Sequence, residues 1–137
     1  PEKDIIFKWE NVLAFEGETG PYLQYSLTRA KMILEKSDTI PQSLPEKFDV
    51  NDYEWILIKQ IAKFPSILLT AAERMRPHYL AKYAFALADS FNKFYETCPV
   101  LKSSSDKLSL RLLLVNAFHN TMRQLLKLLL IPEPKKM

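Results

Sequence analysis

Residues 77–95, PHYLAKYAFALADSFNKFY, decide the fold class of this chain of 137 residues. Large apolar side chains recur there every three or four positions, which is the spacing that places them on one face of an α-helix. Pro77 stands where a helix begins, because a proline in the first turn gives up no hydrogen bond. The spacing predicts a long central helix. Its expected core positions are Leu80, Tyr83, Leu87, Phe91 and Phe94.

The same helical period occurs before and after this segment, in residues 21–37, 51–64 and from 106 to 130. Asn51 and Glu54 have the spacing of a capping box at the start of the second of these helices. The expected core positions are Leu23, Leu27, Ala30 and Ile33 in the first helix, Trp55, Ile58, Ile61 and Ala62 in the second, and Leu112, Val115, Phe118, Met122, Leu125 and Leu129 in the last.

Prolines and polar runs separate these helices. Pro65 ends one helix and starts another over residues 66–75. We expect a long loop over 37–50, and an irregular tail over 131–137 because it contains two prolines. No segment predicts a convincing strand, although residues 4–9 alternate weakly, and Trp9 to Phe15 could equally be a short helix. The predicted fold is an all-α bundle of about five main helices.

The composition excludes several classes of protein. The single cysteine, Cys98, cannot form an intramolecular disulfide, which excludes a disulfide-stapled secreted scaffold and favours a reducing compartment. The two glycines lack the spacing of a phosphate-binding loop. The longest apolar runs are far shorter than the ~20 residues of a membrane span, so we expect no transmembrane helix. The N-terminus lacks Met and a signal peptide, and we expect a fragment of a longer chain.

No residue pattern predicts catalysis or a metal site. The two histidines, His78 and His119, fall on separate helices without a cysteine or second histidine at ligand spacing. We interpret Cys98 as a buried thiol, because no spacing places a general base beside it. The carboxylates of Asp49 and Asp52 flank a helix start, where capping explains them. We therefore expect no catalytic residue, no metal and no cofactor in this chain.

Aromatic side chains beside cations form the most informative surface pattern. Tyr22 and Tyr25 accompany Arg29, and Tyr95 accompanies Lys93 and Lys102. Rings stack on splayed nucleobases while cations meet phosphates, so the pattern favours single-stranded RNA. A net charge of +3 permits a polyanionic ligand. The alternative is that each tyrosine is a half-buried helix residue. The candidate phosphate contacts are Arg29, Lys102, Lys107, Arg111 and Arg123.

Residues 15–25, FEGETGPYLQY, resemble the signature at which class I arginyl-tRNA synthetases pass from the catalytic core to the anticodon-binding domain. Later segments resemble the same domain in the same order, namely RPHYL at 76–80, residues 91–101 with FY and CPVL, RL at 111–112, and PE at 132–133 with a terminal Met. The resemblance implies the family's helical DALR anticodon-binding domain. It also implies a cytoplasmic parent enzyme that joins arginine to its tRNA with ATP and magnesium.

The resemblance implies an RNA-binding role for four residues that match positions near the anticodon loop in that family, namely Tyr22, Tyr25, Tyr95 and Met137. It implies that residues 1–20 connect to a catalytic core and that 21–137 form the helical domain. The chain departs from the family at 128–131, where LLLI replaces LLGI and removes a glycine that eases helix termination. The ending at 133–136 also differs from the usual PERM. Some eukaryotic members carry tryptophan at the position of Pro99.

The HIGH-like and KMSKS-like motifs of class I synthetases are absent from this sequence, so we do not expect it to aminoacylate by itself. The expected partners are arginine tRNA and the catalytic domain of the same chain, with no membrane and no DNA. Two alternatives remain open. One is a non-catalytic helical module whose aromatic patch binds a protein. The other is a non-catalytic relative of the synthetase that binds tRNA.

Overall fold

The computed structural model describes residues 6–12 and 18–135, and within them every regular element is a helix. Five main helices follow one short helix, which confirms the predicted all-α bundle. The bounds are α1 Trp9–Val12, α2 Gly20–Glu35, α3 Asp52–Ala62, α4 Phe64–Glu73, α5 His78–Thr97 and α6 Ser105–Leu128. The weak alternation at residues 6–9 forms no strand, and part of the signature at 15–25 lies outside the described residues.

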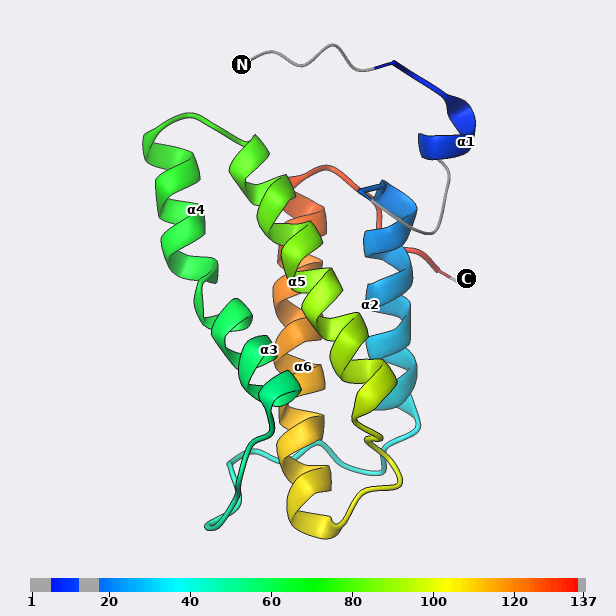
Figure 1. The fold of residues 1–137 in the computed structure, drawn as a ribbon, viewed down its shortest axis with the longest axis vertical. Helices are drawn as coiled ribbons and strands as arrows, with labels where there is room; N and C mark the ends of the chain where they lie inside the picture. Colours follow the sequence, from blue (N-terminus) through cyan, green and yellow to red (C-terminus); the bar gives the residue numbers. More distant parts are fainter. Residues whose placement is uncertain (1–5, 13–17, 136–137) are drawn as a thin grey trace.

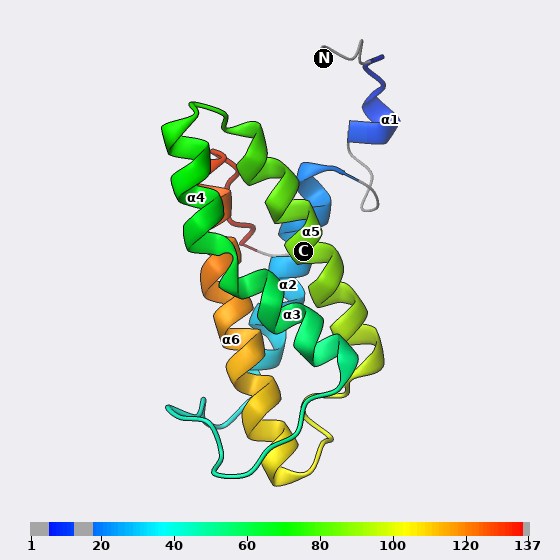
Figure 2. The same ribbon diagram turned by 60° about the vertical axis from the view of Figure 1, so that its left-hand side comes forward.

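The α5 helix is central, as predicted, because it packs against α2, α3, α4 and α6. In Figure 1, α2 lies on one side of it, α3 and α4 lie on the other, and α6 lies behind. Figure 2 shows the same bundle from the side of α4, with α1 apart from the other helices. The colours in Figure 1 show that α2 and α5 run in the same direction. Because α2 and α5 also pack against each other, their side chains meet along a shared boundary.

The helix starts follow the predicted capping chemistry. The Thr19 side chain accepts a hydrogen bond from the Tyr22 amide at 3.3 Å, and Pro21 occupies the first turn of α2. The Asn51 side chain accepts from the Glu54 amide at 2.9 Å, while the Glu54 carboxylate accepts from the Asn51 amide at 2.8 Å. The predicted capping box is therefore confirmed. These bonds satisfy first-turn donors that have no partner within their own helix.

The α3 and α4 helices form a single column broken between Ala62 and Phe64, as Pro65 predicts. By length and composition alone, Asp52–Glu73 is long and apolar enough to cross a membrane. This differs from the expectation of no transmembrane helix, which was based on the shortness of the apolar runs. One such stretch is weak evidence for a span, and this one is divided in two, with a buried Glu54 near its start. We therefore treat its outer side as an exposed face of the bundle. The large apolar residues of this α3–α4 face are Tyr53, Trp55, Ile56 and Leu69.

The core confirms the predicted apolar faces of three helices and corrects the fourth. All predicted core positions of α2 and α5 are buried, as are those of α6 except Leu129, which is partly buried. In α3 the predicted stripe is wrong for Trp55 and Ala62, which are exposed. Leu57 and Glu54 are buried in their place, and Ile58 and Ile61 pack at the edge of the core. The buried face of α3 thus differs from the expected one, because it includes Glu54, whose carboxylate pairs with Arg111 inside the bundle.

The segment after α6 is irregular through Lys135, as its prolines predict. Gln24 Nε2 donates to the carbonyl of Pro132 at 2.8 Å, and Arg123 Nε donates to the Glu133 carboxylate at 3.0 Å. These two contacts hold the tail against α2 and α6. Leu130 ends the helix with a φ of 59°, in the left-handed region that favours glycine.

Candidate nucleic-acid interface

The side chain of Arg29 lies between the rings of Tyr25 and Tyr95. Its Cζ atom is 4.3 Å from the centroid of the Tyr25 ring and 4.7 Å from that of the Tyr95 ring. Its Nη2 donates to the Tyr25 hydroxyl at 2.9 Å. The contact with Tyr25 follows from four-residue spacing on α2, whereas Tyr95 comes from the last turns of α5. Attraction between the guanidinium and the ring faces holds both rings in one cluster.

A buried asparagine, Asn92, contacts Arg29, and a buried serine, Ser26, contacts Asn92. Asn92 Oδ1 accepts from Arg29 Nη1 at 3.1 Å, and Asn92 Nδ2 donates to Ser26 Oγ at 2.9 Å. Ser26 Oγ in turn donates to the carbonyl of Tyr22 at 3.0 Å. Neither contact of Asn92 was predicted from the sequence. The available signal was a polar residue directly after Phe91 in a helix with a broad apolar face, which does not reveal a partner 63 residues away.

The sequence predicts Lys93 and Lys102 beside Tyr95, but the structure places the guanidinium of Arg29 over its ring. Lys93 pairs instead with Asp89, with 3.0 Å between Nζ and Oδ2. The hydrogen bond and the charge of Asp89 raise the pKa of Lys93. Tyr95 remains 39% exposed, so part of its ring is open to a ligand.

Tyr22 lies on the same boundary of α2 and α5, nearer the start of both helices, and is partly buried. It lines a cleft of about 960 Å³ together with Lys63, Tyr79 and Lys82. We call Tyr22, Tyr25, Arg29 and Tyr95 the tyrosine seam. The structure thus brings three of the four residues implied by the resemblance to one boundary between two helices, while Met137 lies outside the described residues.

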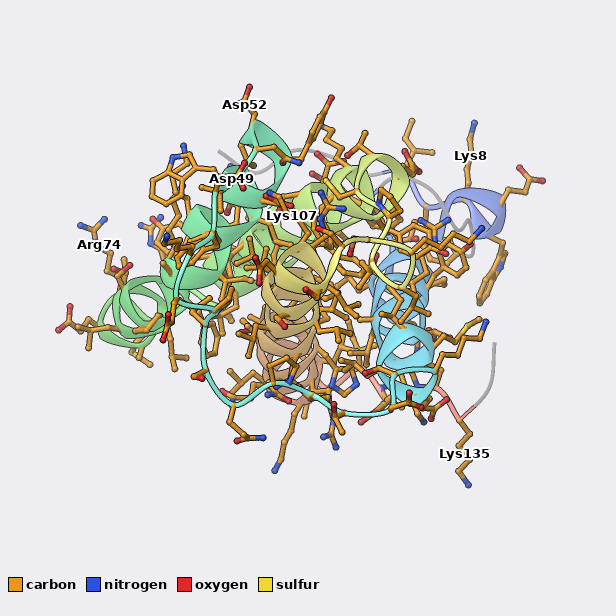
Figure 3. The ribbon with its side chains drawn as sticks, turned by 90° about the horizontal axis from the view of Figure 1, so that it is seen from below. Lys8, Asp49, Asp52, Arg74, Lys107 and Lys135 are labelled. Carbon is orange, nitrogen blue, oxygen red and sulfur yellow. The ribbon has the colours of Figure 1, made fainter. Side chains whose placement is uncertain are left out.

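The other predicted phosphate contacts lie in different surroundings. Lys102 is exposed in the turn before α6. Arg123 is half-exposed and paired with Glu133. Lys107 Nζ donates to the carbonyl of Asp49 at 2.8 Å and to the Glu54 carboxylate at 2.9 Å. Figure 3, seen from below, shows Lys107 and Asp49 beside each other.

Arg111 is buried, and its guanidinium contacts atoms of the protein. Its Nε donates to Glu54 Oε1 at 2.7 Å, and its Nη1 donates to the carbonyl of Pro99 at 2.7 Å. Burial raises the pKa of Glu54, but hydrogen bonds from Arg111, the Asn51 amide and Lys107 outweigh it and lower the pKa below its ordinary value. Arg111 and Lys107 thus compensate a buried carboxylate, which was also missed from the sequence.

Two other residues considered as candidate sites, Cys98 and His119, have side-chain atoms buried in the protein. Cys98 is buried, as predicted, and its Sγ accepts from Asn51 Nδ2 at 3.4 Å. His119 has a buried Nε2 without a hydrogen-bond partner within the described part of the chain. Burial, followed by the charge of Arg123, lowers the pKa of His119. In residues 6–12 and 18–135, no three His, Cys, Asp or Glu side chains group as a metal site would require.

Comparison with known proteins places this geometry in a family. Residues 23–137 match the model of the DALR anticodon binding domain. An arginine–tRNA ligase of Methanoregula boonei is 45% identical over 130 residues, which are 94% of this chain and 23% of that protein. One from Pyrococcus furiosus is 39% identical and covers 100% of this chain, again with 23% of the relative. The chain therefore spans about a quarter of the length of these relatives.

Solved structures agree with the sequence matches. The arginyl-tRNA synthetase of Thermus thermophilus superposes with a TM-score of 0.90 at 38% identity, over 100% of this chain and 24% of that chain. The arginyl-tRNA synthetase of Plasmodium falciparum superposes with a TM-score of 0.83 at 28% identity, over 98% of this chain and 24% of that one. The helical bundle, its order of segments and its sequence together show that this chain belongs to the family of DALR anticodon-binding domains.

Proposed function

We propose that this chain binds the anticodon loop of arginine tRNA and positions that tRNA for aminoacylation by a catalytic domain elsewhere in a longer protein. The observation that carries the proposal is the cluster in which Arg29 joins the rings of Tyr25 and Tyr95. Unstacked bases stack on such rings, and the part of Tyr95 that is exposed gives a base access to this cluster. The choice of arginine tRNA is supported by the similarity to arginine–tRNA ligases.

The proposed base contacts are Tyr22, Tyr25, Tyr95 and Met137. The rings of Tyr22 and Tyr25 are only partly buried, and Tyr95 is more exposed, so each combines packing with a surface for a base. Inclusion of Met137 rests on the resemblance. It is supported by the contact of Gln24 with Pro132, which holds the described part of the tail against the helix that carries Tyr22 and Tyr25.

We propose Lys102 and Arg123 as phosphate contacts, because their side chains are at the surface. Lys107 and Arg111 are left out of the proposed interface, since both donate to the buried Glu54 carboxylate. Their removal would test the stability of the bundle more than RNA binding. A double variant, Lys102→Met with Arg123→Met, should weaken tRNA binding equally for all anticodons. It should also reduce the salt-dependence slope by roughly 0.7 to 0.9 per contact.

The longer protein would supply the chemistry. We propose that its catalytic domain uses ATP and magnesium and acts in the cytoplasm, with residues 1–20 as the connection and residues 21–137 as the tRNA-placing domain. Anticodon binding would hold the distant acceptor end at the catalytic site. The domain would therefore contribute through placement and discrimination instead of bond chemistry.

A second candidate function is protein binding through the α3–α4 face. Tyr53, Trp55 and Ile56 are each 44–50% exposed on this face, and exposed apolar patches mark protein contacts. This candidate predicts a stable complex with a polypeptide and no response to tRNA. Anticodon binding predicts a salt-sensitive complex that is selective for arginine tRNA.

The test is direct binding of the 137-residue chain to arginine tRNA and to the same tRNA with substituted anticodon bases, at several salt concentrations. Tyr95→Ala should weaken binding to the native anticodon by the ~1–3 kcal/mol that stacking of one base contributes. Tyr53→Ala is the matched control, because Tyr53 has a similar exposure of 44% but lies on α3.

Selective loss of affinity with either the anticodon substitution or Tyr95→Ala, but not with Tyr53→Ala, would support anticodon binding by the tyrosine seam. Equal binding to every tRNA would reject anticodon binding and leave general electrostatic attraction. Equal loss with Tyr53→Ala and Tyr95→Ala would reject the seam as the site.

A further inference from the structure

We infer that Ser26 and Asn92 are positioning residues that fix Arg29 between Tyr25 and Tyr95, so that the two rings are already arranged before RNA binds. This inference rests on the proposed function. It gives Arg29 a role different from the phosphate contact predicted from the sequence, and it assigns a role to two residues that do not face the ligand.

The hydrogen-bond geometry fixes the orientation of the Asn92 amide. Its Oδ1 accepts from Arg29 Nη1, which can only donate, and its Nδ2 donates to Ser26 Oγ. Asn92 is 7% exposed and Ser26 is 0% exposed, so water does not readily replace either partner. If Arg29 turned toward solvent, the buried Oδ1 would lose its donor, which is costly. The buried pair therefore favours one position of the guanidinium.

That position determines how the two rings lie. The guanidinium contacts both ring faces, at 4.3 Å and 4.7 Å, and also donates to the Tyr25 hydroxyl. Tyr95 is 39% exposed on α5, where the nearby Lys93 is already paired with Asp89. Arg29 thus links this ring to α2. A ring held in place before binding loses less conformational entropy when a base stacks on it, which increases affinity.

The same geometry argues against a role for Arg29 as a phosphate contact. Asn92 and the Tyr25 hydroxyl take one N–H from each Nη atom of Arg29, so a phosphate that bound both Nη atoms would have to share this edge of the guanidinium with them. A positioning role and a phosphate role predict different outcomes. Loss of positioning weakens binding of the native anticodon selectively, whereas loss of a phosphate contact weakens all tRNAs alike and reduces the salt-dependence slope.

The experiment compares Ser26→Ala, Asn92→Leu and Arg29→Met with the unchanged chain, using arginine tRNA with native and with substituted anticodons at several salt concentrations. Ser90→Ala is the matched control, because Ser90 is also buried on α5 and its Oγ donates to a carbonyl of its own helix, that of Leu87. Thermal unfolding of each variant is measured in parallel. Ser26→Ala removes one oxygen atom, the one that accepts from Asn92, and it still tests the inference if Asn92→Leu does not fold.

We expect Asn92→Leu to raise the Kd for the native anticodon by about three- to tenfold, as loss of a hydrogen bond predicts. Ser26→Ala should act in the same direction with a smaller effect. The Kd for substituted anticodons and the salt slope should not change, and Ser90→Ala should bind like the unchanged chain. Arg29→Met should reduce selectivity in the same way without changing the slope.

The inference is overturned if the unchanged chain distinguishes anticodons but Ser26→Ala and Asn92→Leu keep the same ratio of Kd values. It is also overturned if Arg29→Met weakens all tRNAs equally and reduces the slope by roughly 0.7 to 0.9, as for a phosphate contact. If the unchanged chain does not distinguish anticodons, the proposed function itself fails, which separates the two failures.

Discussion

The Nε of Arg111 donates to the Oε1 of Glu54 at 2.7 Å, and both side chains are buried between α3 and α6. The Glu54 carboxylate also caps α3 and accepts from Lys107. One charged group therefore connects a helix start, a neighbouring helix and, through the Arg111 contact with Pro99, the turn after α5. Removal of one partner from a buried pair leaves the other charge without compensation.

Glu54→Gln is expected to lower the free energy of unfolding by about 3–5 kcal/mol, because it leaves Arg111 buried without an opposite charge. Urea unfolding followed by circular dichroism measures the change. Glu46→Gln, in the exposed loop before α3, is the control and should change stability by less than about 0.5 kcal/mol. Replacing both partners, as Glu54→Leu with Arg111→Met, should cost less than the sum of the single variants. An additive result would contradict coupling between the two side chains.

The lowered pKa of Glu54 predicts how stability depends on pH. Above its ordinary value of 4.5 the carboxylate is ionised in both states, and its contribution to stability is fully present. As pH falls from this value through the lower folded pKa, the unfolded state binds the proton first, and the contribution is lost. Urea unfolding between pH 6 and 3 should show a smaller decrease for Glu54→Gln than for the unchanged chain. Parallel profiles would contradict the assignment.

His119 predicts a second pH dependence, at higher pH. Burial and Arg123, with a smaller effect of Lys31, lower its pKa below the ordinary 6.5, while Glu133 and the Asn120 side chain partly offset this. Stability associated with neutral His119 is present above 6.5 and is lost as pH falls toward the folded pKa. His119→Gln should reduce the decrease in stability between pH 7.5 and 5.5.

Periodicity predicted most of the fold because α2, α5 and α6 bury apolar side chains at regular spacing. The α3 helix shows the limit of this approach. Trp55 is the largest apolar residue of its helix and was assigned to the core, but the structure buries Glu54 one position earlier. A charged residue is buried only with compensation, and its partners lie 53 and 57 residues further along the chain. The local sequence pattern of α3 does not show that Lys107 and Arg111, so far along the chain, will pack against Glu54.

The candidate site was predictable only where its contacts are local. Tyr25 and Arg29 are four residues apart on one helix, so their proximity follows from the sequence. The approach of Tyr95 to the same guanidinium depends on the packing of α2 against α5, and Lys93, its neighbour in sequence, pairs with Asp89 instead. The resemblance to a known family named the three tyrosines together, and the structure places them at one boundary between α2 and α5. Their role in RNA binding stays a prediction.

The end of α6 gives a last prediction, at a position where this chain lacks the family's glycine. Leu130 has a φ of 59° and is 90% exposed, so its side chain packs little while its backbone occupies the left-handed region. The bend lets the Ile131 amide donate to the carbonyl of Leu126 at 2.9 Å, which closes the helix. A residue with a Cβ is strained there, and glycine is not.

Leu130→Gly should therefore raise the free energy of unfolding by about 0.5–1 kcal/mol, after subtracting the greater flexibility of glycine in the unfolded chain. Leu128→Gly is the matched control, because Leu128 is the last residue of α6, is 49% exposed and has no positive φ. It should lower stability by about 1 kcal/mol. Met75→Gly should resemble Leu130→Gly, since Met75 has a φ of 51° and is 87% exposed after α4. Urea unfolding should give opposite signs for Leu130→Gly and Leu128→Gly, and equal losses would show that the left-handed residue carries no strain.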